Sequence, residues 1–346
     1  MAPEGRYQRV LVTGGLGFIG SSYVRLLLTE TALEVVNLDL MTYAAHPETL
    51  QELTSDPRYA ARYTFVKGDI ADPAVVRRAL EGCDAVVNFA AETHVDRSIH
   101  DAAPFVHTNV EGVRVLLDAV REAARERPVR FVHVSTDEVY GEVLEGLSRE
   151  DDPFRPRSPY SASKAGGDLL VGAYGVTYGL DTVVTRGSNN YGTHQFPEKI
   201  IPLFITNALD DQPLPVYGTG KAIRDYIFVT DHVRGIHAAL LRGRRGEAYN
   251  LGGQNQTDGL SVARTILDAL GKPHTLIQHV QDRPGHDLRY ALDITKATRE
   301  LGWRPTVTFA EGIAQTVRWY QEHPDWWRPL KAAQAAFFTQ QYAQRS

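Results

Sequence analysis

Two stretches of the sequence hold ionisable side chains at spacings that suit proton transfer. Thr136, Asp137 and Glu138 follow an apolar, β-branched run, and Tyr160 and Lys164 open a helical pattern after a proline-rich loop. The apolar run predicts a buried strand, and ligands collect at the carboxyl ends of strands in an open parallel sheet. Because two adjacent carboxylates are costly to bury without a chemical role, we predict acid and base chemistry at this strand end.

Tyr160 and Lys164 are four residues apart, so they share one face of the predicted helix. A lysine ammonium near a phenol favours the phenolate, and so does a bound cationic nicotinamide. A free tyrosine titrates near pH 10, so lowering its pKa by about 3 units needs about 4 kcal/mol of differential stabilisation. Tyr160 would then act as a general base near neutral pH. Either motif alone is common by chance, and it is their order along the chain that favours the functional interpretation.

A glycine-rich turn precedes both stretches and predicts a dinucleotide site. Gly14, Gly17 and Gly20 follow an apolar run at 9–13 and precede a helical pattern. Glycines allow a tight turn and let the backbone approach a pyrophosphate at the helix N-terminus. Asp39 ends the next strand pattern, at the distance of about 20 residues where a carboxylate binds the ribose 2′-hydroxyl. A carboxylate repels a 2′-phosphate, so NAD is favoured over NADP.

Four further positions in this half are compatible with a bound cofactor or substrate. Asp69, at a strand end, could hydrogen-bond an adenine amino group or cap a turn. Ala90 and Ala91 leave room for a cofactor, and Thr93 could donate to a phosphate or sugar.

Apolar runs alternate with helical patterns over the first half of the chain, which predicts an α/β fold with a doubly wound parallel sheet. The predicted strands are residues 9–13, 34–38, 63–67, 85–89, 130–134 and 181–186. We expect an NAD-binding Rossmann domain at 1–186, to which about 223–250 returns. Prolines and glycines become frequent after Arg186, which predicts a smaller substrate-binding lobe at 187–222 and 251–330 and a tail helix at 331–346. The cleft between the two would hold the substrate.

The composition excludes several classes of function. The formal net charge of -5 over 346 residues argues against a general nucleic-acid binder. The sequence contains no run of about 18 apolar residues, so it predicts no membrane span. A single cysteine, Cys83, rules out an internal disulfide and is compatible with a cytoplasmic location. We predict no metal site.

Three cationic residues lie beside sequence patterns typical of loops, where they could bind an anionic substrate. Lys199, Arg224 and Arg283 occupy such positions in the second half. An acidic protein that handles a diphosphate needs groups of this kind, because the guanidinium fork pairs well with phosphate.

From about residue 8 to about 320 the sequence resembles the extended short-chain dehydrogenase/reductases and, within them, the dTDP-glucose 4,6-dehydratases. The matching stretches are residues 12–20, 90–98, 135–141, 160–164, 188–192, 196–199, 214–218, 223–225 and 282–287. Thr-Asp-Glu followed by Val-Tyr-Gly is the specific signal, because the 4-epimerases of this superfamily generally lack that acid pair.

The resemblance implies a role for each residue of the predicted site. Tyr160 takes the proton of the sugar 4-hydroxyl while hydride leaves C4 for NAD, and Lys164 lowers the pKa of Tyr160 and holds the nicotinamide ribose. Thr136 hydrogen-bonds the C4 oxygen. Glu138 removes the proton from C5, and Asp137 protonates the departing C6 hydroxyl. Hydride then returns to C6, which gives a 4-keto-6-deoxy sugar.

The resemblance also implies a homodimer, formed through helices near 104–124 and 160–178, and two sets of contacts. The expected cofactor contacts are Gly14, Gly17, Phe18, Ile19, Gly20, Asp39, Met41, Thr42, Asp69, Ile70, Phe89, Ala90, Ala91, Thr108, Tyr160 and Lys164. The expected substrate contacts are Thr93, Thr136, Asn189, Lys199, Pro215, Tyr217, Arg224, Arg283 and His286.

Some positions depart from the family pattern and leave alternatives open. Leu40 follows the ribose aspartate where lysine is usual, Thr93 replaces serine, and Thr193-His194 replaces Pro-Tyr. Gly259, in the altered loop 254–259, stands near an expected asparagine that approaches the base, so the choice of dTDP or UDP stays open. The alternatives are a UDP-sugar 4,6-dehydratase, a UDP-sugar 4-epimerase or decarboxylase, and a non-catalytic NAD-binding regulator. The acid pair argues against the epimerase, and the intact set of four reactive side chains argues against the regulator.

Overall fold

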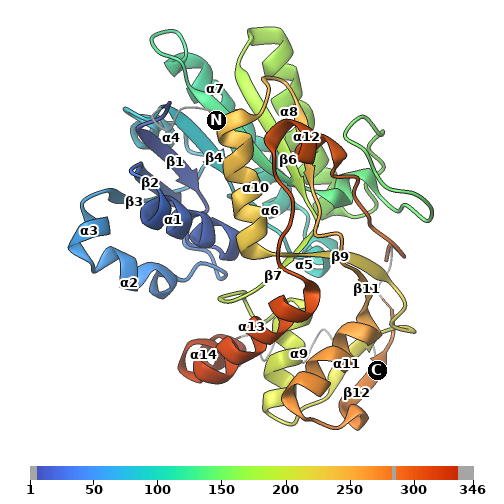
Figure 1. Ribbon diagram of the computed structural model, residues 1–346. Coiled ribbons are helices and arrows are strands. Elements are labelled where there is room, and N and C mark those ends of the chain that lie inside the picture. The colour runs from blue at the N-terminus through green and yellow to red at the C-terminus, as the bar shows by residue number, and fades with distance from the viewer. Residues whose placement is uncertain (1–5, 283–285, 334–346) are drawn as a thin grey trace.

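A parallel β-sheet forms the centre of the larger part of the molecule (Figure 1). The computed structural model describes residues 6–282 and 286–333, and within these ranges the sheet has seven strands in the order β10-β6-β5-β4-β1-β2-β3. The strands are β1 (Arg9–Thr13), β2 (Glu34–Asp39), β3 (Tyr63–Lys67), β4 (Ala85–Asn88), β5 (Arg130–Thr136), β6 (Asp181–Gly187) and β10 (Ala248–Leu251). From β1 the chain adds β2 and β3 on one side and then β4, β5 and β6 on the other. The predicted doubly wound sheet is confirmed.

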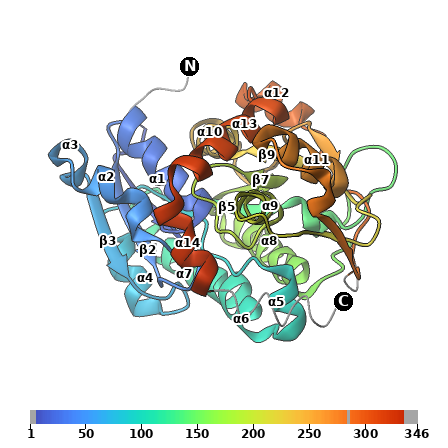
Figure 2. The same ribbon diagram turned by 90° about the horizontal axis from the view of Figure 1, so that it is seen from below.

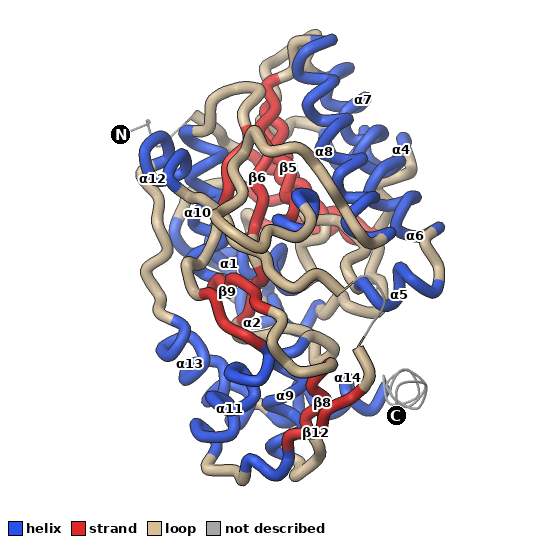
Figure 3. The backbone as a smooth tube through the Cα atoms, turned by 90° about the vertical axis from the view of Figure 1, so that its right-hand side faces the viewer, coloured by secondary structure: helices blue, strands red, loops and turns tan. Residues whose placement is uncertain are grey.

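Helices cover both faces of this sheet, because successive strand residues point to opposite sides. The covering helices are α1 (Phe18–Glu30), α4 (Pro73–Leu80), α7 (Val113–Ala123), α8 (Pro159–Tyr178) and α10 (Val229–Arg242). Val10 and Val12 pack with α1 and α10 in one apolar cluster, whereas Leu11, between them, packs with α4, α7 and α8 in another. Figure 3 shows α1 and α10 on one side of the strands and α7 and α8 on the other.

A smaller lobe lies at one end of the sheet, and Figure 2 views the molecule from that end. In it β11 (Gln256–Asp258), β9 (Ile223–Phe228) and β7 (Asn189–Tyr191) form one small sheet, and β8 (Leu214–Tyr217) pairs with β12 (Ile277–Val280). A third apolar cluster joins β7, β8, β9 and β12 to α9 (Ile200–Leu209), α11 (Gly259–Leu270), α13 (Phe309–Glu322) and Trp327. Of the segment about 223–250, β9 thus belongs to the small sheet, and α10 and most of β10 belong to the central one.

The remaining elements are short. They are η1 (Pro47–Leu50), α2 (Gln51–Thr54), α3 (Pro57–Ala60), α5 (Val95–His100), α6 (Ala103–Val106), η2 (His107–Gly112), η3 (Asp137–Tyr140), η4 (His274–Leu276), α12 (Thr295–Leu301) and α14 (Pro324–Ala333). The helix expected near 104–124 is therefore α6, a π-helical segment η2 and α7 in succession. The expected tail helix at 331–346 lies outside the described residues beyond Ala333. No helix in the described part of the chain is long and apolar enough to cross a membrane.

The first turn of α8 is tightly defined, and it carries Tyr160. Ser158 caps the helix, because its hydroxyl accepts a hydrogen bond from the backbone N–H of Ser161 at 3.0 Å, and Pro159 fills the first helical position. Gly179, with a φ of +67°, ends the helix in the left-handed conformation that suits glycine. These signals place Tyr160 and Lys164 at the start of the helix, beside the end of β5.

Candidate active site

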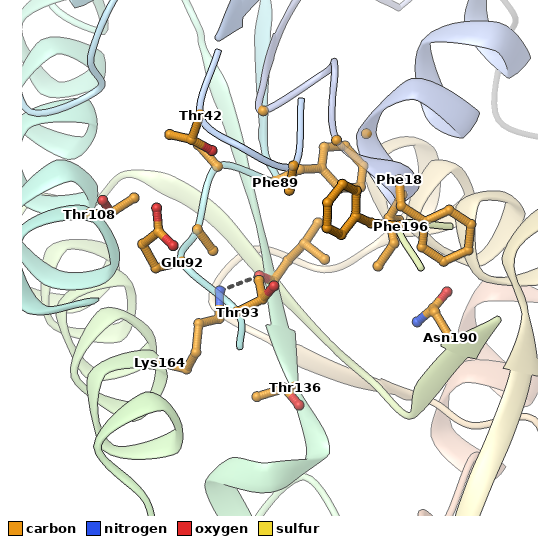
Figure 4. Close-up of a pocket in the computed structure, with 18 of the residues that line it drawn as sticks. Phe18, Thr42, Phe89, Glu92, Thr93, Thr108, Thr136, Lys164, Asn190 and Phe196 are labelled. Carbon is orange, nitrogen blue, oxygen red and sulfur yellow. Dashed lines mark hydrogen bonds between the residues drawn. The ribbon is translucent and has the colours of Figure 1, made fainter. Parts of the chain in front are cut away.

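A cavity of about 310 Å³ opens at the carboxyl ends of the central strands. Figure 4 shows Thr136 and Lys164 entering it beside β5 and α8, with Phe18 and Phe196 on the opposite side. Every expected cofactor contact lines this cavity except Met41, which neighbours it and donates its backbone N–H to Asp39. The lining includes Gly14, Gly17, Phe18, Ile19, Gly20, Asp39, Thr42, Asp69, Ile70, Phe89, Ala90, Ala91, Thr108, Tyr160 and Lys164.

The glycine turn brings backbone close to the cavity in a way that larger residues would prevent. Gly14 has a φ of +68°, and a Cβ there would lie 2.7 Å from the backbone nitrogen of Ala90. A Cβ on Gly20 would lie 2.1 Å from the carbonyl oxygen of Gly14. Gly17 is the residue before α1 and provides no side-chain cap, so the first N–H groups of this helix suit an anion. The turn therefore fits a pyrophosphate.

Asp39 ends β2 at the rim of the same cavity. Its Oδ2 accepts a hydrogen bond from the backbone N–H of Leu16 at 2.9 Å, and its Oδ1 accepts one from Met41 at 2.7 Å. Burial raises the pKa of the carboxyl group, and the two hydrogen bonds oppose that rise. Asp39 is thus held with lone pairs available to hydroxyl donors, as the ribose of NAD requires.

Tyr160 and Lys164 are both buried in this cavity, and burial shifts the pKa of each side chain toward the neutral form. Burial and the charge of Glu138 raise the pKa of the Tyr160 phenol, whereas a hydrogen bond with Thr136 opposes the rise. Burial lowers the pKa of Lys164 to about 8, against the opposing charge of Asp168. The Lys164 ammonium donates to the carbonyl oxygen of Val134 at 2.8 Å. The lowering of the Tyr160 pKa that the sequence predicts, by Lys164 together with a bound nicotinamide, stays a prediction.

The two carboxyl groups after β5 have different surroundings. The Thr136 hydroxyl donates to Asp137 Oδ1 at 3.2 Å and accepts from the backbone N–H of Glu138 at 3.3 Å. Asp137 is buried, and burial followed by the charges of Glu138 and Asp225 raises its pKa well above the usual range. Glu138 is half-buried. The arrangement favours a protonated Asp137 beside a more accessible Glu138.

A second cavity of about 220 Å³ lies in the smaller lobe and shares part of its wall with the first. Thr93, Glu138, Asn189 and Lys199 line both cavities. Of the other expected substrate contacts, Thr136 lines only the first cavity, and Pro215, Tyr217, Arg224 and His286 line only the second. Arg283 lies outside the described residues. The structure thus brings the described members of both predicted sets around two adjoining spaces.

Other lining residues were not predicted as site residues. They include Glu92, Ser135, Asn190, Gln195, Phe196, Glu198 and His232. Phe196 and Glu198 lie in a stretch that matches the family, so their place beside Lys199 was the available signal. His232, on α10, follows no motif that marks it. Its two ring nitrogens have no hydrogen-bond partner among the described residues, and burial lowers its pKa to about 3.

Comparison with known proteins agrees with this geometry. The family model described as GDP-mannose 4,6 dehydratase matches residues 11–316. A dTDP-glucose 4,6-dehydratase from Streptomyces niveus is 50% identical over 333 residues, which cover 95% of this chain and 97% of the relative. One from Salmonella typhimurium is 44% identical over 363 residues, covering 97% of this chain and 99% of the relative.

The similar solved structures include dehydratases and, at lower sequence identity, epimerases. A dTDP-glucose 4,6-dehydratase from Streptomyces venezuelae, with NAD bound, has a TM-score of 0.90 and 50% identity and covers 94% of this chain and 100% of its own. A UDP-glucuronic acid 4-epimerase from Bacillus cereus, also with NAD, has a TM-score of 0.84 and 30% identity, covering 91% and 99%. The sheet, the glycine turn and the Tyr160–Lys164 pair define an extended short-chain dehydrogenase/reductase. Within that class, the chain belongs to the dTDP-glucose 4,6-dehydratase family.

Proposed function

We propose that this protein dehydrates dTDP-glucose to dTDP-4-keto-6-deoxyglucose and keeps its NAD through the cycle. The observation that carries the proposal is the pair of unlike carboxyl groups at the end of β5. Burial and neighbouring charges favour the protonated form of Asp137, and the charges of Glu138 and Asp137 both influence Tyr160. Elimination of water across C5 and C6 needs an acid and a base in addition to the base at the 4-hydroxyl, whereas epimerisation at C4 needs no such additional pair.

Three features of the first cavity fit a bound NAD. The uncapped start of α1 and the close approach of Gly14 suit its pyrophosphate, and Asp39 suits its adenosine ribose. When bound, NAD supplies the hydride acceptor for C4 and the later hydride donor for C6, and its positive charge favours the Tyr160 phenolate.

The proton transfers are assigned to four side chains. Tyr160 takes the proton of the sugar 4-hydroxyl, and the Thr136 hydroxyl binds the C4 oxygen. The resulting ketone acidifies the C5–H bond, so Glu138 removes that proton. Asp137 gives its proton to the C6 hydroxyl, which leaves as water while a C5–C6 double bond forms. Addition of a hydride at C6 and of a proton at C5 completes the 4-keto-6-deoxy sugar.

The second cavity is assigned to the nucleotide diphosphate. Arg224 is buried, and its guanidinium donates to the carbonyl oxygen of Asp287 at 2.9 Å, which holds the charge in place. The Lys199 ammonium donates to the carbonyl oxygen of Thr93 at 3.0 Å, at the wall between the cavities. A diphosphate lying between these cations would leave the hexose near Glu138.

We also propose that the protein acts as a homodimer in the cytoplasm. Val106, Leu169 and Val176, on α6 and α8, are 53%, 65% and 90% exposed. Apolar side chains so accessible on neighbouring helices suit a second copy of the chain.

The test is to incubate the purified protein separately with dTDP-glucose and UDP-glucose, without added NAD, and to identify the products by mass spectrometry. Loss of one water from dTDP-glucose, faster than from UDP-glucose, is the expected result. A faster reaction of UDP-glucose would reassign the nucleotide. No mass change with either sugar would contradict the proposed dehydration, and NMR at C4 would then test for an epimerase.

A further inference from the structure

Tyr43 connects the loop after β2 to a buried carboxylate at the wall between the two cavities. Its hydroxyl donates to Glu198 Oε1 at 3.0 Å. The Arg97 guanidinium lies 4.0 Å from the centre of the Tyr43 ring, and its Nη2 is 3.5 Å from Glu198 Oε2. The Glu198 side chain is only 2% exposed. Three segments far apart in the sequence therefore meet at one point.

The loop that carries Tyr43, residues 40–46, forms part of the cofactor cavity. Leu40, Thr42, Ala44 and Ala45 line that cavity. The loop is anchored at its end, where the backbone N–H of His46 donates to the carbonyl oxygen of Leu16 at 3.0 Å. Between its ends, the loop depends on side-chain contacts to keep its place.

Phe196 supplies a second set of such contacts. Its ring lies edge-on to Tyr43 at 5.7 Å and is stacked on His46 at 5.4 Å, with the two planes 7° apart. Phe196 itself lines the cofactor cavity, and Glu198 lines both cavities. The loop is thus held from the side of the substrate lobe, through Phe196 and Glu198.

We propose that Tyr43, Arg97 and Glu198 form a clasp that holds the loop 40–46 against the cofactor cavity, and that the Tyr43 hydroxyl sets how slowly NAD leaves. Tyr43 is a positioning residue, because it acts through the loop. The inference rests on the proposed function, in which one NAD is reduced and reoxidised within a turnover. Loss of the reduced cofactor midway would strand the keto sugar, so slow release has a chemical purpose.

The experiment compares wild type with Tyr43→Phe, and uses Tyr7→Phe as the matched control. The buried Tyr7 hydroxyl has no hydrogen-bond partner among the described residues, and Tyr7 precedes the amino end of β1, away from the cavity. NAD content per chain is measured after acid release, and the rate of NAD loss by exchange with labelled NAD. A hydrogen bond to a charged acceptor is lost in Tyr43→Phe, so exchange should be about tenfold faster or more. Saturating NAD should restore wild-type kcat, and Tyr7→Phe should match wild type.

The outcomes are distinguishable. Equal exchange rates in Tyr43→Phe and wild type would overturn the clasp and leave the proposed dehydration standing. Faster exchange with a kcat that saturating NAD does not restore would also overturn it, because Tyr43 would then act on the chemistry or the fold. A wild type that contains no NAD and does not dehydrate the sugar when NAD is added would instead contradict the proposed function.

Discussion

The two cavities differ in the residues that line them and in the space around their glycines. The cofactor cavity contains the glycine turn, where a Cβ on Gly14 or Gly20 would collide with other backbone atoms. The second cavity is lined by residues of α9, of strands β8 and β9 and of loops, together with Gly259 at the start of α11. At its Gly259 a Cβ would come no closer than 3.6 Å to the carbonyl oxygen of Gly220. The glycine turn of the first cavity therefore cannot accept larger residues, whereas position 259 of the second cavity can.

The largest effect is expected from a substitution that abolishes turnover but leaves binding in both cavities intact. Tyr160→Phe removes the general base but leaves the ring, so turnover should fall at least about 10³-fold. NAD content and nucleotide-sugar affinity should stay at wild-type values in calorimetry. A residual rate above a tenth of wild type would show that another group takes the 4-hydroxyl proton.

The acid pair gives the next effect. Asp137→Asn or Glu138→Gln should spare the oxidation at C4 but slow elimination by about 10²-fold or more. The absorbance of the reduced cofactor at about 340 nm should then persist after substrate is added, whereas in wild type it should not. Full elimination in Glu138→Gln would show that the base is assigned wrongly.

A change confined to the second cavity tests whether the two spaces bind independently. Arg224→Leu removes a buried cation there, so KM should rise about tenfold or more while NAD content is unchanged. Arg234→Leu is the control, because Arg234 is an exposed arginine on α10 that pairs with Glu30. Loss of NAD from Arg224→Leu would show that the cavities do not bind independently.

The smallest effect concerns stability. The pKa of Lys164 in the folded protein is about 8, below the ordinary 10.5, so its buried charge costs stability below pH 8, and this cost is relieved as pH rises to 10.5. After removal of the cofactor, the stability of wild type minus that of Lys164→Met should rise by about 1 kcal/mol between about pH 7 and 9. Urea unfolding at each pH measures this difference. A constant difference would mean that Lys164 keeps its ordinary pKa.

Much of the cofactor half could be predicted because its signals are local. Apolar runs gave the central strands up to β6, and the spacing of Gly14, Gly17 and Gly20 marked the turn, since one tight turn needs all three at short range. β5 continues two residues beyond the predicted end, so that Thr136 is its last residue. Such differences at strand ends change little.

The rest depends on contacts that local patterns do not contain. His232 and Glu198 reach the cofactor cavity from segments far along the chain, and only Glu198 has a sequence neighbour of related function, Lys199. The pKa of Tyr160 rises because the residue is buried, and burial is a property of the whole fold. The sequence analysis also did not predict the π-helical segment η2, which interrupts the helix expected near 104–124. Asn109 within it binds the backbone N–H of Glu92 at 3.0 Å.

The position of β10 has a consequence for synthesis on the ribosome. β10 pairs with β6 at the edge of the central sheet, but it follows the first segment of the smaller lobe in the chain. As the polypeptide emerges, the outer edge of β6 stays without its partner until residue 251 is available, and an open strand edge invites pairing with other chains. A fragment that ends at residue 222 would keep that edge exposed and should aggregate, so the cofactor half cannot be produced alone by simple truncation.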